Sequence, residues 1–480
     1  MNIFSLITLI ILLEILKAKL ILPLKFININ QTYNKMQQDF LSSLYSKKLY
    51  LNMSIGSNEE DIKGILDMEQ IGFYIYENAY NYNLSSSFMK ENKTQRFYKR
   101  NNEEGYISND TICLNHVNDI IYNKYEKCED NKIVSFALLN SNKKEENSIY
   151  ERYSIIGLQQ NDYFDEKVTP LFIHSLKDSN LIDSHLFSFY FNENEMNNEF
   201  IGYLLLGNNS EIKDNDNIEI IKFSTERKYG FPFWGITFDQ VSIGLNNSNI
   251  SSKDNKYKTF QNTEVELVAN LPYILGIYDY NVHVKFYFFY DLLQKNICRY
   301  ITVPYNPEYS TYVCDSKSDL FIQYYNTKFI NLYFIHKDSN TTFVLDKNDL
   351  FSYNLNNKSD TQIYFLVLFY NSLTYYDKIK RFKLGIPFIK KYKFSFHPED
   401  RVINYYMNKT MNNIEKEDRP KSNESFELFI KIIIIIILLV IVFCLGILFH
   451  KYVIKSPKKK LANELDDDYE YKTNPIINSD

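Results

Sequence analysis

Hydrophobic and polar residues alternate over short stretches of the chain, which is the pattern of half-buried β-strands. Residues Tyr50–Ile55 alternate, a turn signal follows, and a second strand is expected over Ile62–Leu66, running into Asp67. Helical spacing is confined to a few segments such as Thr169–Leu181, and a strand pattern follows at Phe187–Phe191. The pattern therefore predicts a mainly β region with few helices.

Two continuous apolar runs interrupt this pattern, one near each end of the chain. The first, Ile3–Leu13, has the length of the apolar part of a signal peptide, and Ala18 offers a small residue for cleavage. Residues 1–18 are therefore expected to be a signal peptide. No Lys or Arg precedes the run, which leaves an uncleaved anchor as the alternative.

The second run, Ile432–Phe449, has 18 apolar residues, enough for about 27 Å of helix. It can begin at Leu428 if the side chain of Lys431 reaches the membrane surface, so the predicted transmembrane helix covers residues 428–449. Lysines follow the run closely, at Lys451, Lys455 and Lys458–Lys460.

Those lysines predict the orientation of the chain in the membrane. By the positive-inside rule, residues 450–480 form a cytoplasmic tail and the preceding part is lumenal or extracellular. The polar segment 407–427 is typical of a stalk. Twelve N-glycosylation sequons, from Asn30 to Asn423, all precede the apolar run, which agrees with a glycoprotein. The sequence thus predicts a single-pass type I membrane protein of the secretory pathway, the endolysosomal system or the cell surface.

Composition sets the size of the lumenal region and excludes some partners. With 480 residues, 45% of them hydrophobic, the chain can form two lobes with separate cores, because single cores stop growing at about 250–300 residues. The net charge of −5 and the lack of a basic patch interleaved with aromatic residues argue against a nucleic-acid partner. Seven scattered histidines fit no zinc spacing, so no metal and no cofactor are expected.

Four of the five cysteines precede the predicted span, and Cys444 lies within it. In an oxidising compartment the four are expected to form two disulfides, although the sequence leaves three connectivities open. The local pairs, Cys113 with Cys128 and Cys298 with Cys314, are the preferred choice.

Several segments follow one another in a fixed order over about 350 residues. They are Tyr50–Gly56 with Asp67 eleven positions on, Phe97-Tyr98 with Gly105–Ile112, Ser154–Leu158, Thr169–Phe172, Asn180–Ile182, Leu186–Tyr190, Leu204–Gly207, Phe233–Phe238 and Leu384–Tyr392 with Arg401-Val402. This series resembles the pepsin-like eukaryotic aspartyl proteases. The resemblance implies an all-β, bilobal acid protease fold with a cleft between an N-terminal lobe, residues 19–195, and a C-terminal lobe, residues 196–406.

The resemblance also implies a catalytic pair. Enzymes of this family use two Asp side chains, one ionised to take a proton from a water and one protonated to polarise the scissile carbonyl. Asp67 matches the first Asp of the family's Asp-Thr-Gly motif, but Met68 and Glu69 occupy the Thr and Gly positions. The family's Thr hydroxyl braces the two loops, and that brace is expected to be lost here.

The second motif departs further from the family. Residues Leu267–Leu275 align with Ile-Val-Asp-Thr-Gly-Thr-Ser-Leu, which places Ala269 at the second Asp. A shift of one residue gives Asn270, which cannot act as an acid. Loss of general acid–base assistance lowers the rate by a factor of about 10²–10⁴, so we predict a pseudoprotease. Asp67 would then act as an ordinary turn or capping residue.

Three other carboxylates are weighed as substitutes for the lost acid. Glu69 lies two residues from Asp67, although a solvated surface charge is the simpler interpretation. Glu266 and Asp279 flank the second motif, and either would require the loop to move.

Four further positions match the family or depart from it. Tyr98 matches the flap tyrosine that closes over bound peptide, with a packing residue as the alternative, and Lys99 and Asn101 replace the flexible glycines of the flap. Ile386 replaces an Asp of the closing element.

The sequence as a whole predicts a monomeric, membrane-anchored and non-catalytic member of the family that binds an extended peptide or protein in its cleft. The alternative is an active aspartic endopeptidase in which Asp67 works with a substitute carboxylate. A third interpretation is a surface glycoprotein in which the fold is only a scaffold.

Overall fold

The computed structural model describes the chain over residues 19–28, 44, 46–97, 103–114, 132–140, 153–160, 169–191, 200–207, 218–225, 233–245, 256–303, 308–353, 361–370 and 381–408. These residues belong to one compact unit, Met1–Asn412, and a second unit covers Asn413–Asp480. The predicted signal peptide, the transmembrane segment 428–449 and the tail lie outside the described residues. Within the described ranges, no helix is long and apolar enough to cross a membrane.

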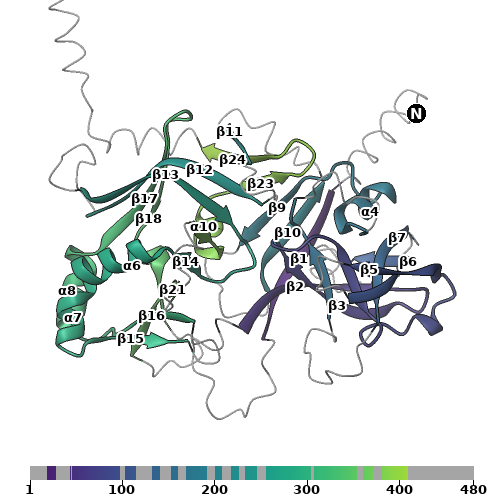
Figure 1. Ribbon diagram of the computed structural model, residues 1–480, viewed down its shortest axis with the longest axis horizontal. Helices are drawn as coiled ribbons and strands as arrows, with labels where there is room; N and C mark the ends of the chain where they lie inside the picture. The colour runs from purple at the N-terminus through teal and green to yellow at the C-terminus, as the bar shows by residue number, and fades with distance from the viewer. Residues whose placement is uncertain are drawn as a thin grey trace, which may run out of the picture. The chain divides into compact units, whose positions relative to one another are not determined.

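The larger sheet has 13 strands among the described residues (Figure 1). Their order is β11-β24-β23-β9-β10-β1-β2-β3-β8-β4-β7-β6-β5, with a further pairing of β2 with β6. The strands are β1 (Lys19–Asn28), β2 (Lys47–Ile55), β3 (Glu60–Asp67), β4 (Phe73–Tyr76), β5 (Met89–Phe97), β6 (Glu103–Leu114), β7 (Lys132–Leu139), β8 (Ser154–Gly157), β9 (Phe187–Phe191), β10 (Phe200–Gly207), β11 (Ile218–Ser224), β23 (Phe394–His397) and β24 (Val402–Asn408).

The second sheet has 11 strands within the same part of the chain. Its order is β18-β17-β12-β13-β22-β14-β21-β16-β20-β19, with β15 beside β16. The strands are β12 (Gly235–Leu245), β13 (Lys256–Leu267), β14 (Ile274–Gly276), β15 (Cys298–Thr302), β16 (Tyr309–Asp315), β17 (Ile330–His336), β18 (Thr341–Leu345), β19 (Phe351–Tyr353), β20 (Gln362–Phe365), β21 (Val367–Tyr370) and β22 (Phe382–Leu384). We call strands β2–β8 the first lobe and this sheet the second lobe. The two large sheets confirm a mainly β fold.

One half of the larger sheet contains strands from the beginning (β1), the middle (β9–β11) and the end (β23 and β24) of the described chain. β1 pairs with β10, β9 pairs with β10 and β23, and β24 pairs with β11. Phe187 and Phe396 stack with ring centroids 4.9 Å apart, and Trp234 meets both rings edge-on. Trp234 also donates a 2.6 Å hydrogen bond from Nε1 to the carbonyl oxygen of Leu158. This aromatic junction therefore joins the second lobe to the end of β8.

Helices are short and few among the described residues. They are η1 (Tyr82–Leu84), α4 (Phe172–Asp178), α6 (Tyr278–Val284), η4 (Lys285–Phe289), α7 (Tyr290–Gln294), α8 (Asp319–Thr327), α9 (Lys347–Leu350) and α10 (Ile386–Lys391). The expected strands around Tyr50–Ile55, Ile62–Leu66 and Phe187–Phe191 are confirmed as β2, β3 and β9, and α4 lies within the helix expected over Thr169–Leu181.

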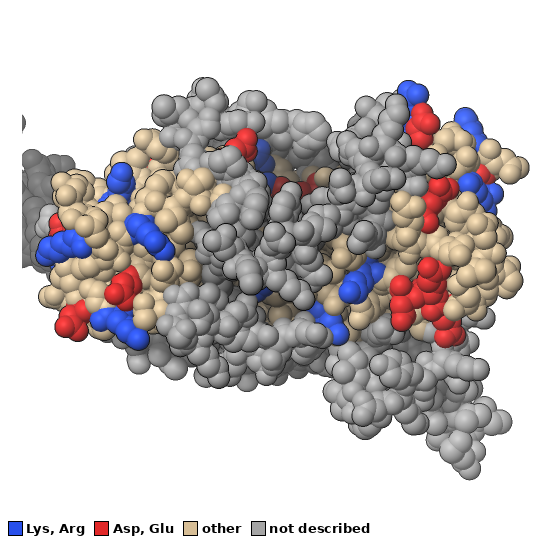
Figure 2. Space-filling view, turned by 90° about the horizontal axis from the view of Figure 1, so that it is seen from below, with Lys and Arg blue, Asp and Glu red and all other residues tan. Residues whose placement is uncertain are grey.

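Acidic and basic side chains of the described residues are mixed on one face of the molecule. On the face drawn in Figure 2, the Lys and Arg side chains of the described residues are interspersed with Asp and Glu, and both signs occur toward both ends. The described residues on that face therefore form no field of a single sign.

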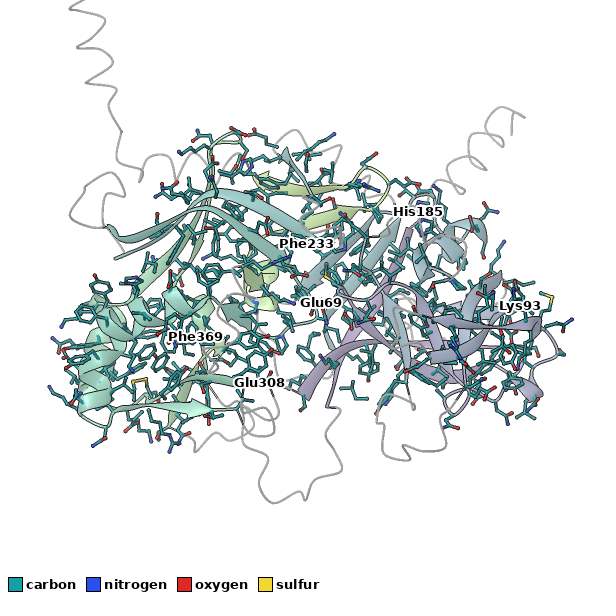
Figure 3. The ribbon with its side chains drawn as sticks, in the orientation of Figure 1. Glu69, Lys93, His185, Phe233, Glu308 and Phe369 are labelled. Atoms are coloured by element: carbon teal, nitrogen blue, oxygen red, sulfur yellow. A yellow bond between two sulfur atoms is a disulfide. The ribbon has the colours of Figure 1, made fainter. Side chains whose placement is uncertain are left out.

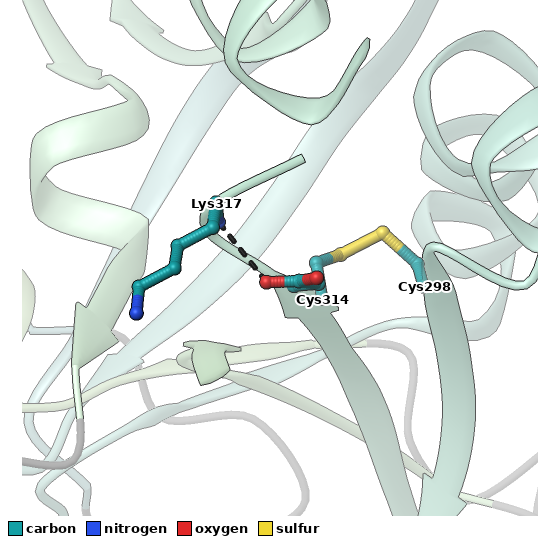
Figure 4. The surroundings of a disulfide bond; sticks show 4 residues. Cys298, Cys314 and Lys317 are labelled. Atoms are coloured by element: carbon teal, nitrogen blue, oxygen red, sulfur yellow. Dashed lines mark hydrogen bonds between the residues drawn. A yellow bond between two sulfur atoms is a disulfide. The ribbon is translucent and has the colours of Figure 1, made fainter. Parts of the chain in front are cut away.

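One of the two expected disulfides is confirmed. Cys298 at the start of β15 is bonded to Cys314 in β16, and the pair closes a loop with a sequence separation of 16 (Figure 4). Beside the bond, the backbone N–H of Lys317 donates to Oδ1 of Asp315 at 3.0 Å. Cys113 lies in β6, but Cys128 is outside the described residues, so its pairing with Cys113 stays a prediction.

Candidate functional site

The first motif loop begins where β3 ends, at Asp67. β3 runs parallel to β8, with Asp67 opposite Gly157, and the N–H of Leu158 donates to the carbonyl oxygen of Asp67 at 2.8 Å. The N–H of Glu69 donates to Oδ1 of Asp67 at 2.8 Å. The Asp67 carboxylate thus accepts a hydrogen bond from its own loop, as a capping residue does.

The second motif loop repeats this arrangement in the other lobe. β13 runs parallel to β22, Leu267 lies opposite Leu384, and the N–H of Val268 donates to the carbonyl oxygen of Leu384 at 2.9 Å. A Cβ on Gly385 would lie 2.2 Å from the carbonyl oxygen of Leu271, so only glycine fits beside this loop.

The strand register also indicates which residue of the second motif loop is equivalent to Asp67. Continued by one residue, it brings Val268 opposite Gly385, as Asp67 lies opposite Gly157. The sequence motif instead places Ala269 at that position. Both residues are fully buried and neither has a carboxyl group. Asn270, the alternative alignment, is buried as well and carries an amide.

Met68 connects the two motif loops. Its N–H donates to Oδ1 of Asn270 at 3.4 Å, and its Sδ accepts from the N–H of Ala269 at 3.0 Å. Met68 is itself buried. The expectation that the brace between the loops is lost was therefore wrong, because a thioether can accept a weak hydrogen bond where a hydroxyl would stand. The amide oxygen of Asn270 and the sulfur of Met68 each accept a hydrogen bond from a backbone N–H of the other loop.

Glu69 is held by a cation of the second lobe. Nζ of Lys383, in β22, bonds to Oε1 of Glu69 and lies 3.7 Å from Oε2 of Glu266, in β13. Lys383 and Glu266 are paired across the two strands. Figure 3 labels Glu69 in the middle of the view, between the strands of the two lobes. We call Glu69, Lys383 and Glu266 the ion triad.

Burial influences the pKa values of Glu266 and Lys383. It is the largest influence on Glu266 and raises the pKa of that carboxyl despite the nearby charge of Lys383. Burial also opposes protonation of Lys383, but the charges of Glu266 and Glu69 outweigh it and hold the pKa of the ammonium above its ordinary value. Lys383 thus stays cationic at neutral and acidic pH.

A known protein family matches the chain over most of the first lobe and the start of the second. The model of the eukaryotic aspartyl protease family matches residues 73–265. Residues 73–265 are therefore similar to the eukaryotic aspartyl proteases. No curated protein matches the chain significantly. The family match starts after Asp67 and ends before Ala269, so it covers neither motif position.

The segments that resemble the family's flap in the sequence lie in the hairpin of β5 and β6 and at its tip. These strands pair from Met89 opposite Asn109 to Phe97 opposite Glu103, with an irregular register between Lys90 and Thr94. Tyr98, Lys99 and Asn101 at the tip lie outside the described residues, so the role of Tyr98 stays a prediction.

A buried carboxylate that sequence reasoning did not select lies at the base of this hairpin. Asp110 in β6 accepts hydrogen bonds from the hydroxyls of Tyr80, Ser85 (3.1 Å) and Ser87 (2.5 Å), and from the N–H of Thr111 (2.8 Å). Burial, assisted by Asp110, raises the pKa of the Tyr80 hydroxyl, which keeps it a donor. These bonds satisfy the Asp110 carboxylate and fix the base of the flap hairpin.

Of the three acids predicted as substitutes, two lie together and the third lies apart. Glu69 and Glu266 meet at Lys383, whereas Asp279 is exposed in the first turn of α6. Lys383 was missed by sequence reasoning. Its position directly before the family's closing Leu-Gly pair was the available signal. Ile386, which stands at a family Asp, is buried in α10, and its N–H donates to the carbonyl oxygen of Leu271 at 2.7 Å.

Proposed function

We propose that the chain is a membrane-anchored, non-catalytic member of the pepsin-like family that binds an extended peptide or protein in the cleft between its lobes. The carrying observation is the contact of Met68 with Ala269 and Asn270. At the place where the family needs a second acid, this protein has buried groups that cannot ionise, and they are packed against the first motif loop.

The state of the candidate substitute acids supports the same conclusion. The Glu69 carboxylate bonds to Lys383, a permanent cation in the pH range where these proteases work. The Glu69 carboxylate is thus occupied by a contact with the second lobe. Glu266 has a raised pKa, as a general acid would, but it shares the same lysine.

The decisive experiment is an activity assay of the full-length chain purified in detergent. Denatured protein is incubated with it at pH 3–6, with and without a peptidomimetic inhibitor of aspartyl proteases, beside the Asp67→Ala variant. We expect no inhibitor-sensitive cleavage and no difference between the two proteins. Inhibitor-sensitive cleavage that disappears in Asp67→Ala would refute the proposal, and Glu69→Gln and Glu266→Gln would then identify the second acid.

Peptide binding needs its own measurement. A fluorescent peptidomimetic inhibitor is titrated with the full-length chain, and its anisotropy is followed, with unlabelled extended peptides as competitors. Saturable binding is expected, because catalysis is not required to hold a peptide. If neither the inhibitor nor any peptide binds, the scaffold interpretation replaces the binding protein.

A further inference from the structure

The helical segment 278–294, formed by α6, η4 and α7, has two apolar faces. Its inner face is formed at four-residue intervals by Tyr280, Val284, Phe288 and Leu292, each no more than 1% exposed. Residues two positions away lie on the opposite side of a helix, since each residue advances the turn by about 100°. Polar residues are expected on that outer side of a surface helix.

The outer face is instead apolar and aromatic. It carries Tyr278, Val282, Phe286 and Tyr290, which are 43%, 43%, 66% and 51% exposed. We call these four residues the outer stripe. Single exposed apolar residues are common and need no explanation, but four in register on one helix form a contiguous surface that indicates a partner.

The π-helical turn keeps the outer stripe straight. In a continuous α-helix, a four-residue step drifts around the axis by about 40°. The segment Lys285–Phe289 is π-helical, and its wider turn reverses part of that drift between Phe286 and Tyr290. Their rings lie 6.4 Å apart between centroids. The helix thus presents one line of apolar side chains.

We propose that the outer stripe docks into the headgroup region of the membrane that anchors the chain, an inference that rests on the proposed anchor. The predicted span begins at residue 428, and 19 residues separate it from Asn408. A chain of 19 residues reaches at most about 65 Å when fully extended. The tether therefore keeps the stripe at a high effective concentration beside the bilayer.

The chemistry of the stripe fits a membrane surface. Tyrosine rings prefer the boundary between lipid tails and headgroups, and the apolar face of an interfacial helix enters this layer by about 5–10 Å. Exposed Lys285, Lys295 and Arg299 can keep their charges among the phosphates. Two acids also flank the helix: Asp291 accepts a 2.6 Å hydrogen bond from the Tyr324 hydroxyl, and Asp279 is exposed.

A second copy of the chain fits this surface less well. Stable protein interfaces take about 20–30 residues and about 800 Å² from each partner. Four side chains on one helix fall far short of that, whereas a tethered helix needs only a modest affinity to lie on its own membrane.

The test uses the full-length chain, with Cys444→Ser, in phosphatidylcholine nanodiscs with or without nitroxide-labelled lipid. A bimane label at Lys285→Cys reports contact with the lipid. A label at Lys93→Cys is the remote reference, because Lys93 lies at the opposite end of the view from α7 (Figures 1 and 3). We expect the nitroxide lipid to quench the label at 285 and to leave the label at 93 unquenched.

The paired substitution Phe286→Ser with Tyr290→Ser should lower the ratio of docked to undocked protein about tenfold or more, since two large exposed apolar groups are removed. Tyr353→Ser is the matched control: Tyr353 is 51% exposed, like Tyr290, but lies on β19, and its removal should not change quenching. Absence of quenching at 285, or quenching that survives the paired substitution, overturns the proposal. Dimer formation that depends on the stripe also overturns it, in favour of a second copy.

The anchor is tested by the same samples. If the paired variant remains bound to the nanodiscs, the result supports the transmembrane anchor, and the quenching measurement then tests the docking alone. If only the wild type stays, the stripe itself binds membrane and the anchor fails. If neither stays, both proposals fail.

Discussion

Replacement of Lys383 by methionine tests whether the ion triad stabilises the contact between the lobes. Methionine keeps most of the side-chain volume and removes the charge. In the wild type, Lys383 is 24% exposed and neutralises Glu266, 10% exposed, and Glu69, 36% exposed. The variant leaves two carboxylates of the same sign facing each other, one of them buried.

The expected loss of stability follows from that burial. Removing one partner of a fully buried ion pair costs about 3–5 kcal/mol, because a buried charge remains uncompensated. Glu69 is partly hydrated, which weakens its interaction with Lys383. We therefore expect Lys383→Met to lower the free energy of unfolding by about 2–4 kcal/mol at pH 7.

The loss should shrink in acid. Burial raises the pKa of Glu266 above its ordinary value of 4.5, and removal of Lys383 raises it further. A carboxyl with a raised folded-state pKa stabilises the fold below its unfolded pKa, and this contribution is lost as the pH rises through the folded-state value. At pH 4.5 much of Glu266 is then protonated in the variant, and its repulsion with Glu69 disappears.

The assay is urea denaturation of the full-length chain at pH 7 and pH 4.5, with Lys295→Met as the control at an exposed lysine. The free energy of unfolding of the control should remain within about 0.5 kcal/mol of the wild-type value. A Lys383→Met protein as stable as the wild type at pH 7, or destabilised equally at both pH values, would show that the ion triad does not stabilise the contact between the lobes.

Three further outcomes are expected. Met68→Leu removes the sulfur acceptor between the motif loops and should cost about 1–2 kcal/mol in urea denaturation, whereas Met89→Leu, at an exposed position, should cost nothing measurable. Replacing Cys298 and Cys314 by serine opens a loop with a sequence separation of 16 and should cost about 3 kcal/mol in the same measurement; an unchanged denaturation midpoint would contradict this. The hydrogen bond from Lys177 holds the pKa of Glu399 below 4.5, a contribution present above pH 4.5 and lost as the pH falls further, so the difference in thermal midpoint between wild type and Glu399→Gln should vanish toward pH 3 rather than persist.

Strands that alternate in hydrophobicity were readable from the sequence. β2, β3 and β9 follow directly from their patterns, since side chains alternate between the faces of a strand. The helix at 278–294 was not predicted, because its Tyr, Phe and Val residues favour strands and both of its faces are apolar. Tertiary packing of the inner face decides its conformation.

The contacts within the site could be predicted only in part. Sequence comparison pointed to Ala269 and to Met68, because both depart from a known motif. The comparison could not show that Met68 accepts a hydrogen bond from the other lobe, because the family has a threonine and not a methionine at this position. Lys383 was missed for a similar reason: its partner Glu69 is 314 positions away, and only the folded chain brings them together.

The departures from the family motif therefore act together rather than one by one. A protease loop must leave room for a water between two acids, and here Met68, Ala269 and Leu271 are buried apolar groups at that junction. The lobes are further joined by Lys383 with Glu69 and by Trp234 with the Leu158 carbonyl. Restoring one carboxyl at position 269 would bury a charge beside a sulfur and would not recreate a water site. In the proposed non-catalytic protein, packing takes the place of the constraints that a catalytic centre would put on these loops.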